Sequence, residues 1–170
     1  VTITTILAEG WSCYGGEYYY YVDGEPYSGW VGEYFVDNGC MQREKVIGAE
    51  GEKHFFVDGY GVRQKNRWVN GGSSYAKEDG TLAENEWLEI DGKKYYFEGI
   101  NKDTGLVYQE GGAADLFDAD GIYIGSSNDM KLGWNLINGE WYYYNADVYT
   151  ALAKNQWVPC RENDGENVWV

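Results

Sequence analysis

Short aromatic runs beside tight-turn dipeptides recur through this chain roughly every 20 residues, and this internal repeat constrains the fold more than any other feature. The runs are EYYYYVDG (17–24), EYFVDNG (33–39), KHFFVDG (53–59), SYAKEDG (74–80), KKYYFEG (93–99), DLFDADG (115–121) and EWYYYNAD (140–147). A repeat of this length indicates a fold made by stacking one small unit. Such a stack offers a long surface, which favours binding over catalysis in one deep cleft.

Each unit can be counted from an aromatic or apolar residue, which we call its start residue. The start residues are Trp11, Trp30, Ile47, Trp68, Trp87, Tyr108, Trp134 and Trp157. In most units a pair of aromatic or apolar residues follows eight and nine positions later, as Tyr95 and Tyr96 follow Trp87, whereas the Trp68 unit keeps only Tyr75. Aromatic runs are typical of short β-strands, and Asp-Gly and Asn-Gly are hairpin-turn signals. No stretch has sustained helical periodicity, so we expect almost no helix.

A single hairpin of this size buries too little surface to be stable, so the hairpins are expected to stack on one another. The predicted fold is all-β: an elongated solenoid of stacked short β-hairpins, with about seven repeats of roughly 20 residues plus caps. The length of 170 residues fits a single repeat domain over residues 1–170. Its N-terminal cap is residues 1–10, its repeats are residues 11–157, and its C-terminal cap is residues 158–170. Residues 122–132 are expected to form a loop inserted in one unit.

The formal net charge of −15 constrains the partners. It argues against a nucleic acid and against an anionic membrane surface, both of which attract basic patches. It is compatible with a neutral or cationic ligand, and it also keeps a secreted protein soluble. No signal peptide and no apolar run long enough for a membrane span is visible, so we interpret the chain as a mature product or an excised fragment.

The cysteines are Cys13, Cys40 and Cys160. An odd number without a CxxC motif predicts neither a disulfide framework nor a zinc site. We expect three buried thiols that pack as small apolar residues, with a Cys13–Cys40 bridge left open as the alternative.

Three segments of the chain resemble the cell-wall-binding repeats of Gram-positive bacteria and their phages. They are GWNLINGEWYYY (133–144), WLEIDGKKYYFEG (87–99), and Trp157-Val158 preceded by Asn155-Gln156. That superfamily includes choline-binding modules, glucan-binding repeats and the receptor-binding repeats of clostridial toxins. The resemblance covers about residues 10–158. It implies a β-solenoid that acts outside the cell, at the bacterial surface, and docks a secreted enzyme, toxin or adhesin onto choline-bearing teichoic acid, glucan or host glycan.

In the choline-binding branch, the resemblance implies a ligand held between consecutive hairpins in a cage of aromatic rings. The cage combines a start tryptophan, an aromatic residue seven positions later, and an aromatic residue of the next unit. A quaternary ammonium is attracted to such ring faces by cation–π interaction. The residues that keep this pattern are Trp134, Trp141 and Trp157, and a weaker version is formed by Trp11, Tyr18 and Trp30.

Other units depart from the choline pattern, because the residue before the aromatic pair is His54, Ser74, Lys94 or Asp115. Lys94 is expected to repel a choline headgroup. These units look more like the toxin and glucan-binding branches, in which the ligand is a neutral sugar that stacks on one flat ring. The candidates for a sugar site are Trp87 with Lys94 and Tyr95, and Trp68 with Tyr75. The alternative role for every one of these rings is packing between hairpins.

We do not expect an enzyme, a metal site or a cofactor. His54 is the only histidine and no G-x-S-x-G motif is present, so serine or cysteine hydrolase chemistry has no basis. Carboxylates concentrate in turns, where they set backbone geometry. The DADG segment (118–121) resembles part of a calcium-binding loop but lacks the remaining ligands, and we interpret it as a hairpin turn.

The predicted function is therefore a non-catalytic module that binds a cell-wall glycan, teichoic acid or other carbohydrate through aromatic stacking. The alternative is a structural spacer or protein-interaction scaffold that has lost its ligand. A homodimer through the solenoid ends is a further expectation, since exposed strand edges invite pairing.

Overall fold

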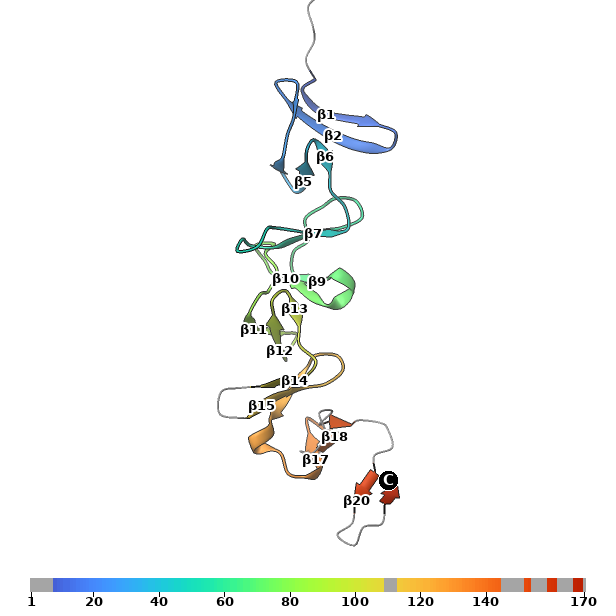
Figure 1. The fold of residues 1–170 in the computed structure, drawn as a ribbon, viewed down its shortest axis with the longest axis vertical. Coiled ribbons are helices and arrows are strands. Elements are labelled where there is room, and N and C mark those ends of the chain that lie inside the picture. The colour runs from blue at the N-terminus through green and yellow to red at the C-terminus, as the bar shows by residue number, and fades with distance from the viewer. Residues whose placement is uncertain (1–7, 109–112, 145–151, 154–158, 162–166, 170) are drawn as a thin grey trace, which may run out of the picture. The chain divides into compact units, whose positions relative to one another are not determined.

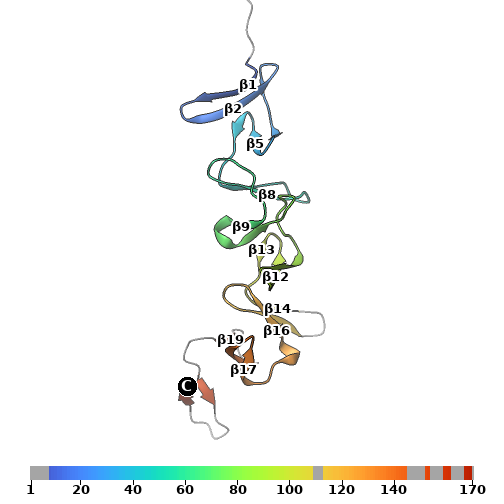
Figure 2. The ribbon, with the colours of Figure 1, turned by 180° about the vertical axis from the view of Figure 1, so that it is seen from behind.

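The computed structural model describes residues 8–108, 113–144, 152–153, 159–161 and 167–169. Figures 1 and 2 show them as a succession of short strands joined by turns. The helical elements among the described residues are two single turns of 3-10 helix, η1 (Asn70–Gly72) and η2 (Ser127–Asp129). The prediction of an all-β hairpin fold with almost no helix is confirmed. None of the described helical segments has the length and apolarity that a membrane crossing requires.

The chain divides into two compact units, the first made of residues 1–84 and 99–101, and the second of residues 85–98 and 102–170. The strands up to residue 84 are β1 (Gly10–Tyr14), β2 (Glu17–Val22), β3 (Glu25–Pro26), β4 (Gly29–Val31), β5 (Tyr34–Asp37), β6 (Cys40–Met41), β7 (Lys45–Ile47), β8 (Phe55–Val57), β9 (Arg67–Val69) and β10 (Ser74–Ala76). The first sheet has the order β1-β2-β6-β5-β4, with β3 paired to β2, and the hairpins β7–β8 and β9–β10 follow as separate sheets.

The later strands form further small sheets. They are β11 (Glu86–Ile90), β12 (Lys93–Glu98), β13 (Asn101–Lys102), β14 (Gly105–Tyr108), β15 (Ala114–Phe117), β16 (Tyr123–Ser126), β17 (Gly133–Ile137), β18 (Glu140–Tyr144), β19 (Leu152–Ala153), β20 (Pro159–Arg161) and β21 (Asn167–Trp169). The β20–β21 hairpin lies in the segment assigned to the C-terminal cap. The single-domain organisation and its cap boundaries stay a prediction.

Two-residue turns close several hairpins because their sequences tolerate positive φ. Asp91 and Gly92 have φ of 51° and 74°, and Asn138 and Gly139 have φ of 51° and 81°. Positive φ at both central residues is the signature of the type I′ turn, whose twist matches that of the flanking strands. These two dipeptides therefore form the hairpin turns that the sequence predicts.

The predicted Asp58-Gly59 turn is wrong in detail. The turn runs from Asp58 to Gly61, whose N–H donates to the Asp58 carbonyl at 2.9 Å. Asp58 Oδ1 also accepts two backbone N–H groups, each at 2.9 Å. Asp118 repeats this arrangement in the DADG segment, where its Oδ1 accepts the N–H groups of Asp120 and Ile122 at 2.9 Å. The Asp118 carboxylate thus holds a turn, and the described residues contain no group of three or more His, Cys, Asp or Glu side chains arranged for a metal ion.

Two further expectations are corrected: the start residue of the third unit, and the loop expected over residues 122–132. Val46 lies opposite Phe56 across the β7–β8 ladder, as Trp87 lies opposite Tyr96, so the third unit starts at Val46 and not at Ile47. The segment 122–132 is not simply a loop, because β16 pairs with β15 and η2 follows.

The cysteines also differ from expectation. Cys13 is an exposed free thiol, and Cys40 is free and partly buried. Strand β2 lies between the strands that carry them, with Tyr18 opposite Cys13 and Tyr19 opposite Cys40. Tyr18 and Tyr19 point to opposite faces, so the two thiols are too far apart for the bridge. The side chain of Cys160 lies outside the described part.

Each hairpin has two unlike faces, because side chains alternate along a strand. On the β11–β12 hairpin one face carries Ile90, Tyr95 and Phe97, which are all buried. The other face carries Trp87 and Tyr96. A buried cluster of Phe56, Val69, Ala76 and Leu82, with Val46 and Ile100 packed against it, forms a core within the first unit.

Candidate ligand-binding site

Each start tryptophan that the structure describes lies directly opposite an aromatic residue on the other strand of its hairpin. The pairs are Trp11–Tyr20, Trp30–Phe35, Trp68–Tyr75, Trp87–Tyr96 and Trp134–Tyr143. Their ring centroids are 5.0, 5.2, 5.3, 5.1 and 5.3 Å apart, in the same order. Contacts of this geometry stabilise a hairpin beyond the area they bury. One face of every such hairpin is therefore a two-ring aromatic platform.

The residue two positions before the second ring shares this face with the tryptophan. It is Tyr18 beside Trp11, Lys94 beside Trp87, and Trp141 beside Trp134. By the same alternation Tyr95 points to the other face of its hairpin and is only 7% exposed. The structure thus brings together Trp11 with Tyr18 and Trp134 with Trp141, but it does not bring Tyr95 to Trp87.

A groove of about 520 Å³ opens beside Trp11, and we call it the Trp11 groove. Its lining is Trp11, Gly16, Tyr18, Tyr34, Met41, Arg43, Gly59 and Tyr60. Trp11 and Tyr18 are 41% and 47% exposed, so both rings are open to a ligand. The ring of Tyr34 lies edge-on to Trp11 at 5.7 Å. The next-unit aromatic in this groove is therefore Tyr34 and not the expected Trp30.

Sequence reasoning missed Tyr34, Tyr60 and Arg43 as lining residues. The Arg43 guanidinium lies 5.7 Å from the ring centroid of Tyr18. It also lies 3.8 Å from the Glu17 carboxylate. Tyr34 was detectable, because Trp30 pairs with Phe35 and the neighbouring Tyr34 must then point to the other face. Arg43 carries no comparable signal, since it lies outside the repeat motif.

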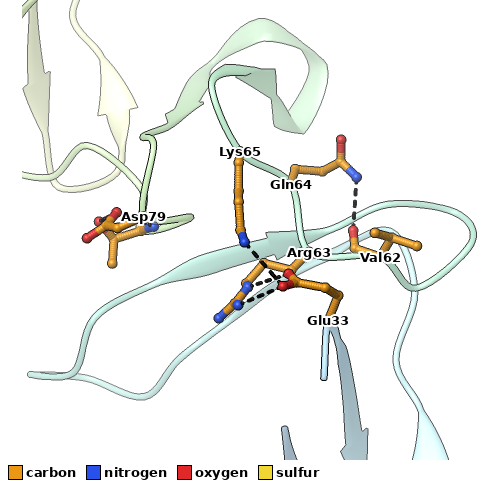
Figure 3. A network of polar contacts seen from close by, with 7 residues as sticks. Glu33, Val62, Arg63, Gln64, Lys65 and Asp79 are labelled. Atoms are coloured by element: carbon orange, nitrogen blue, oxygen red, sulfur yellow. Dashed lines mark hydrogen bonds and ion pairs between the residues drawn. The ribbon is translucent and has the colours of Figure 1, made fainter. Parts of the chain in front are cut away.

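Trp30 belongs to a second aromatic cluster, with Phe35 and Phe55. The guanidinium of Arg63 lies over two of these rings, 4.9 Å from the centroid of Trp30 and 5.7 Å from that of Phe55. Figure 3 shows how Arg63 is held: its Nε and one Nη donate to the Glu33 carboxylate, at 3.0 and 3.2 Å, and Lys65 Nζ donates to the same carboxylate at 3.2 Å. Hydrogen bonds from Arg63, and then from Lys65, lower the pKa of Glu33.

Trp87 lies in a third aromatic group, the Trp87 cluster, with Tyr96, Phe117 and Tyr123. Phe117 stacks on Trp87 at 5.6 Å, and Tyr123 meets it edge-on at 5.1 Å. The Lys94 ammonium lies 4.6 Å from the centroid of Trp87 and 5.2 Å from that of Tyr123. Burial, and then the charge of Asp115 and a hydrogen bond with it, raise the pKa of Tyr123. Lys94 therefore does not stand apart from the rings as an isolated polar group, because it is in contact with two of them.

The face of the β17–β18 hairpin is an exposed apolar surface, which we call the Trp134 face. It consists of Trp134, Leu136, Trp141 and Tyr143. Trp134 and Trp141 are 41% and 56% exposed. No cation from the described part of the chain lies over either ring. The expected third member, Trp157, lies outside the described residues.

The remaining candidate residues are placed differently. Trp68 and Tyr75 contact each other edge-on and are both partly buried, as expected for rings that pack between hairpins. Ser74 is fully buried. His54 Nδ1 lies 3.0 Å from the Glu84 carboxylate, which links the β7–β8 hairpin to the segment after β10.

No protein-family model matches the chain, and comparison with curated protein sequences found no significant match. Solved structures do match. The modular autolysin LytC of Streptococcus pneumoniae, solved in complex with a synthetic peptidoglycan ligand, is 26% identical over 87% of this chain, with a TM-score of 0.57. Choline binding protein F of the same species is 25% identical over 95% of the chain, with a TM-score of 0.51.

The choline-binding domain of CbpL, from the same organism, shares the fold at 22% identity, with a TM-score of 0.55 over 95% of this chain. The match covers 87% of that domain. It covers only 34% of LytC and 57% of choline binding protein F. The chain thus spans about a third of the autolysin's length.

Proposed function

The chain belongs to the superfamily of choline-binding and related cell-wall repeats, and we propose that it is a non-catalytic module that binds a cell-wall polymer outside the cell. The observation that carries the proposal is the Trp11 groove. Its rings come from Trp11, Tyr18, Tyr34 and Tyr60, and its volume of about 520 Å³ suits a headgroup or one sugar ring.

The chemistry of the groove favours two kinds of ligand group. A trimethylammonium group cannot donate ordinary hydrogen bonds, so ring faces are its natural partners. A sugar stacks its C–H surface on one ring and needs polar neighbours for its hydroxyl groups, which Tyr60 and Arg43 supply. The contact of Arg43 with Tyr18 supports the first choice, because this ring already attracts a cation.

The Trp134 face is the second proposed contact surface. Each surface alone offers few rings, and a cation–π contact at an exposed site contributes roughly 0.5–1 kcal/mol per ring. A polymer that repeats its headgroup engages both surfaces of the same chain. The second contact then becomes intramolecular, and the overall affinity exceeds that of either surface.

The scaffold alternative is favoured by one observation. The rings of Trp30 and Trp87 are already in contact with Arg63 and Lys94. If the Trp11 groove and the Trp134 face also fail to bind, the chain is a spacer with closed aromatic sites. The expected homodimer stays a prediction.

The test compares Tyr18→Ala with Tyr14→Ala, two tyrosines on opposite faces of the β1–β2 hairpin. Tyr14 is 82% exposed and lies outside the groove lining, so it is a matched control. Co-sedimentation with purified choline-bearing cell walls measures the bound fraction. We expect Tyr18→Ala to weaken binding about 5-fold, the equivalent of ~1 kcal/mol, and Tyr14→Ala to bind like the wild type. Equal binding by both variants would remove the groove from the proposal.

A further inference from the structure

Among the described residues, three cationic side chains lie over aromatic rings of the hairpin faces. They are Arg43 on Tyr18, Arg63 on Trp30 and Phe55, and Lys94 on Trp87 and Tyr123. Their positions within the repeat differ, and they reach the rings from different strands and turns. The recurrence indicates that the aromatic faces of several hairpins attract a positive charge.

Lys94 has the geometry of a bound ammonium ligand. Its Nζ is within about 6 Å of two ring centroids, the range over which cation–π attraction is effective, at 4.6 Å from Trp87 and 5.2 Å from Tyr123. Tyr123 and Phe117 also contact each other, at 5.6 Å, so the walls of the Trp87 cluster support one another.

The position of Lys94 in the hairpin is what makes this contact informative. Glu89 is its direct cross-strand partner, yet no carboxylate of the described residues lies within ion-pair distance of Lys94. Its ammonium lies over the rings instead. Trp141 occupies the same hairpin position beside Trp134, and Tyr18 occupies it beside Trp11.

We propose that Lys94 is an internal ligand that fills the ammonium site of the Trp87 cluster, and that the residue at this hairpin position determines which aromatic face accepts an external quaternary ammonium. Where an aromatic residue stands there, no cation of the described residues lies over the start tryptophan: Arg43 lies over Tyr18 and not over Trp11, and the Trp134 face carries none. A lysine there occupies the face. The inference rests on the proposed function, because it assumes a ligand that carries such a group.

Lys94 is a better test than Arg63. Arg63 donates two hydrogen bonds to Glu33, which it shares with Lys65, so its removal disrupts this ion-pair network as well as the aromatic site. Lys94 is exposed, and its replacement removes no ion pair within the described chain. Lys94 is covalently tethered beside the rings of the Trp87 cluster, so it competes for them at a high local concentration with any external ammonium group.

The experiment follows the indole N–H signal of Trp87 by NMR, assigned with Trp87→Phe, during titration with choline chloride. In the wild type this signal should not respond beyond a matched sodium chloride titration. In Lys94→Ala it should shift saturably, with a Kd on the order of 1–10 mM. Lys94→Arg keeps the cation and should stay silent, and Lys93→Ala removes a neighbouring exposed lysine from the opposite face and should also stay silent.

A silent Trp87 signal in Lys94→Ala would overturn the inference, and so would an equal response in the wild type. The result is independent of wall binding. If the intact chain fails to bind walls while Lys94→Ala still gains the Trp87 response, the proposed function fails and the role of Lys94 stands. If the intact chain binds walls but Lys94→Ala gains no Trp87 response, the proposed function stands and the role of Lys94 fails.

Discussion

Arg63 holds its guanidinium 4.9 Å from the ring centroid of Trp30 while it donates two hydrogen bonds to Glu33. Glu33 sits on the turn between β4 and β5, so one carboxylate of the hairpin fixes a cation over that hairpin's own tryptophan. The arrangement uses a polar network to position a charge on an aromatic face. Trp30 lines a groove of about 360 Å³, but its ring is already in contact with the Arg63 guanidinium.

The Arg63–Glu33 pair predicts an acid-dependent loss of stability. The folded-state pKa of Glu33 is lowered, so its stabilising effect is complete above the unfolded pKa and is lost as the pH falls through the folded pKa. Glu33→Gln should lower the free energy of unfolding at pH ~7 by less than ~1 kcal/mol, because the pair is partly exposed, and by almost nothing near pH ~2. Urea unfolding of the wild type and of Glu33→Gln at both pH values measures this change in the free energy of unfolding. Glu78→Gln, an exposed carboxylate, is the control, and equal effects for the two variants would contradict the prediction.

Because the Asp118 side chain holds its turn, its removal should destabilise the fold more than removal of the neighbouring Asp120 side chain. Asp118→Ala removes an acceptor shared by two backbone N–H groups, and should lower the free energy of unfolding by about 1 kcal/mol. Asp120→Ala changes an exposed side chain in the same turn and should cost much less. Thermal unfolding of the two variants measures this. If Asp120→Ala is the more damaging change, the assignment of the turn is wrong.

We expect the substitution Asp103→Asn to stabilise the fold. One oxygen of the Asp103 carboxylate is buried without a hydrogen-bond partner among the described residues, and burial, followed by the charge of Glu98, raises its pKa. The ionised form is therefore penalised at neutral pH. The penalty shrinks as the pH falls through the folded pKa and is absent below the unfolded pKa. Asp103→Asn should raise the free energy of unfolding at pH 7 by on the order of 1 kcal/mol. Denaturant unfolding at pH 7 and near pH ~3 tests the sign, and a gain that persists in acid would refute it.

Trp141 and Trp134 should respond differently to truncation. Trp141 is the more exposed ring, whereas Trp134 contacts Tyr143 at 5.3 Å. Trp141→Ala should weaken wall binding with little loss of melting temperature. Trp134→Ala should weaken binding and also cost roughly 0.5–1.5 kcal/mol of stability. If Trp141→Ala unfolds the protein, Trp141 is a packing residue and the Trp134 face is not a site.

The repeat, the hairpins and most of the turns were predictable, because aromatic runs beside Asn-Gly and Asp-Gly specify strands and type I′ turns locally. The start at Val46 was not. The β7–β8 loop is longer than a two-residue turn, so counting forward from the first strand loses the register. The pairing of β7 with β8, in which Val46 lies opposite Phe56, is needed to identify Val46 as the start residue.

Part of the candidate site was predictable for the same reason. A tryptophan and the residue seven positions later share a face in a tight hairpin, which places Trp134 with Trp141. The positions of Arg43 and Lys94 over rings could not be derived, because long side chains choose among several partners that strand periodicity does not specify. The expectation that Lys94 repels choline stays a prediction, and it did not place the Lys94 ammonium over the rings of Trp87 and Tyr123.

We expect this chain to attach to a cell-wall polymer through its aromatic surfaces. Co-sedimentation of the intact chain with purified choline-bearing walls, in the absence and presence of free choline or soluble wall glycan, tests this attachment. The chain should pellet with the walls, one of these competitors should release it, and the double variant Tyr18→Ala/Trp141→Ala should stay in the supernatant. A wild-type chain that stays in the supernatant at every wall concentration would show that the aromatic surfaces do not bind walls.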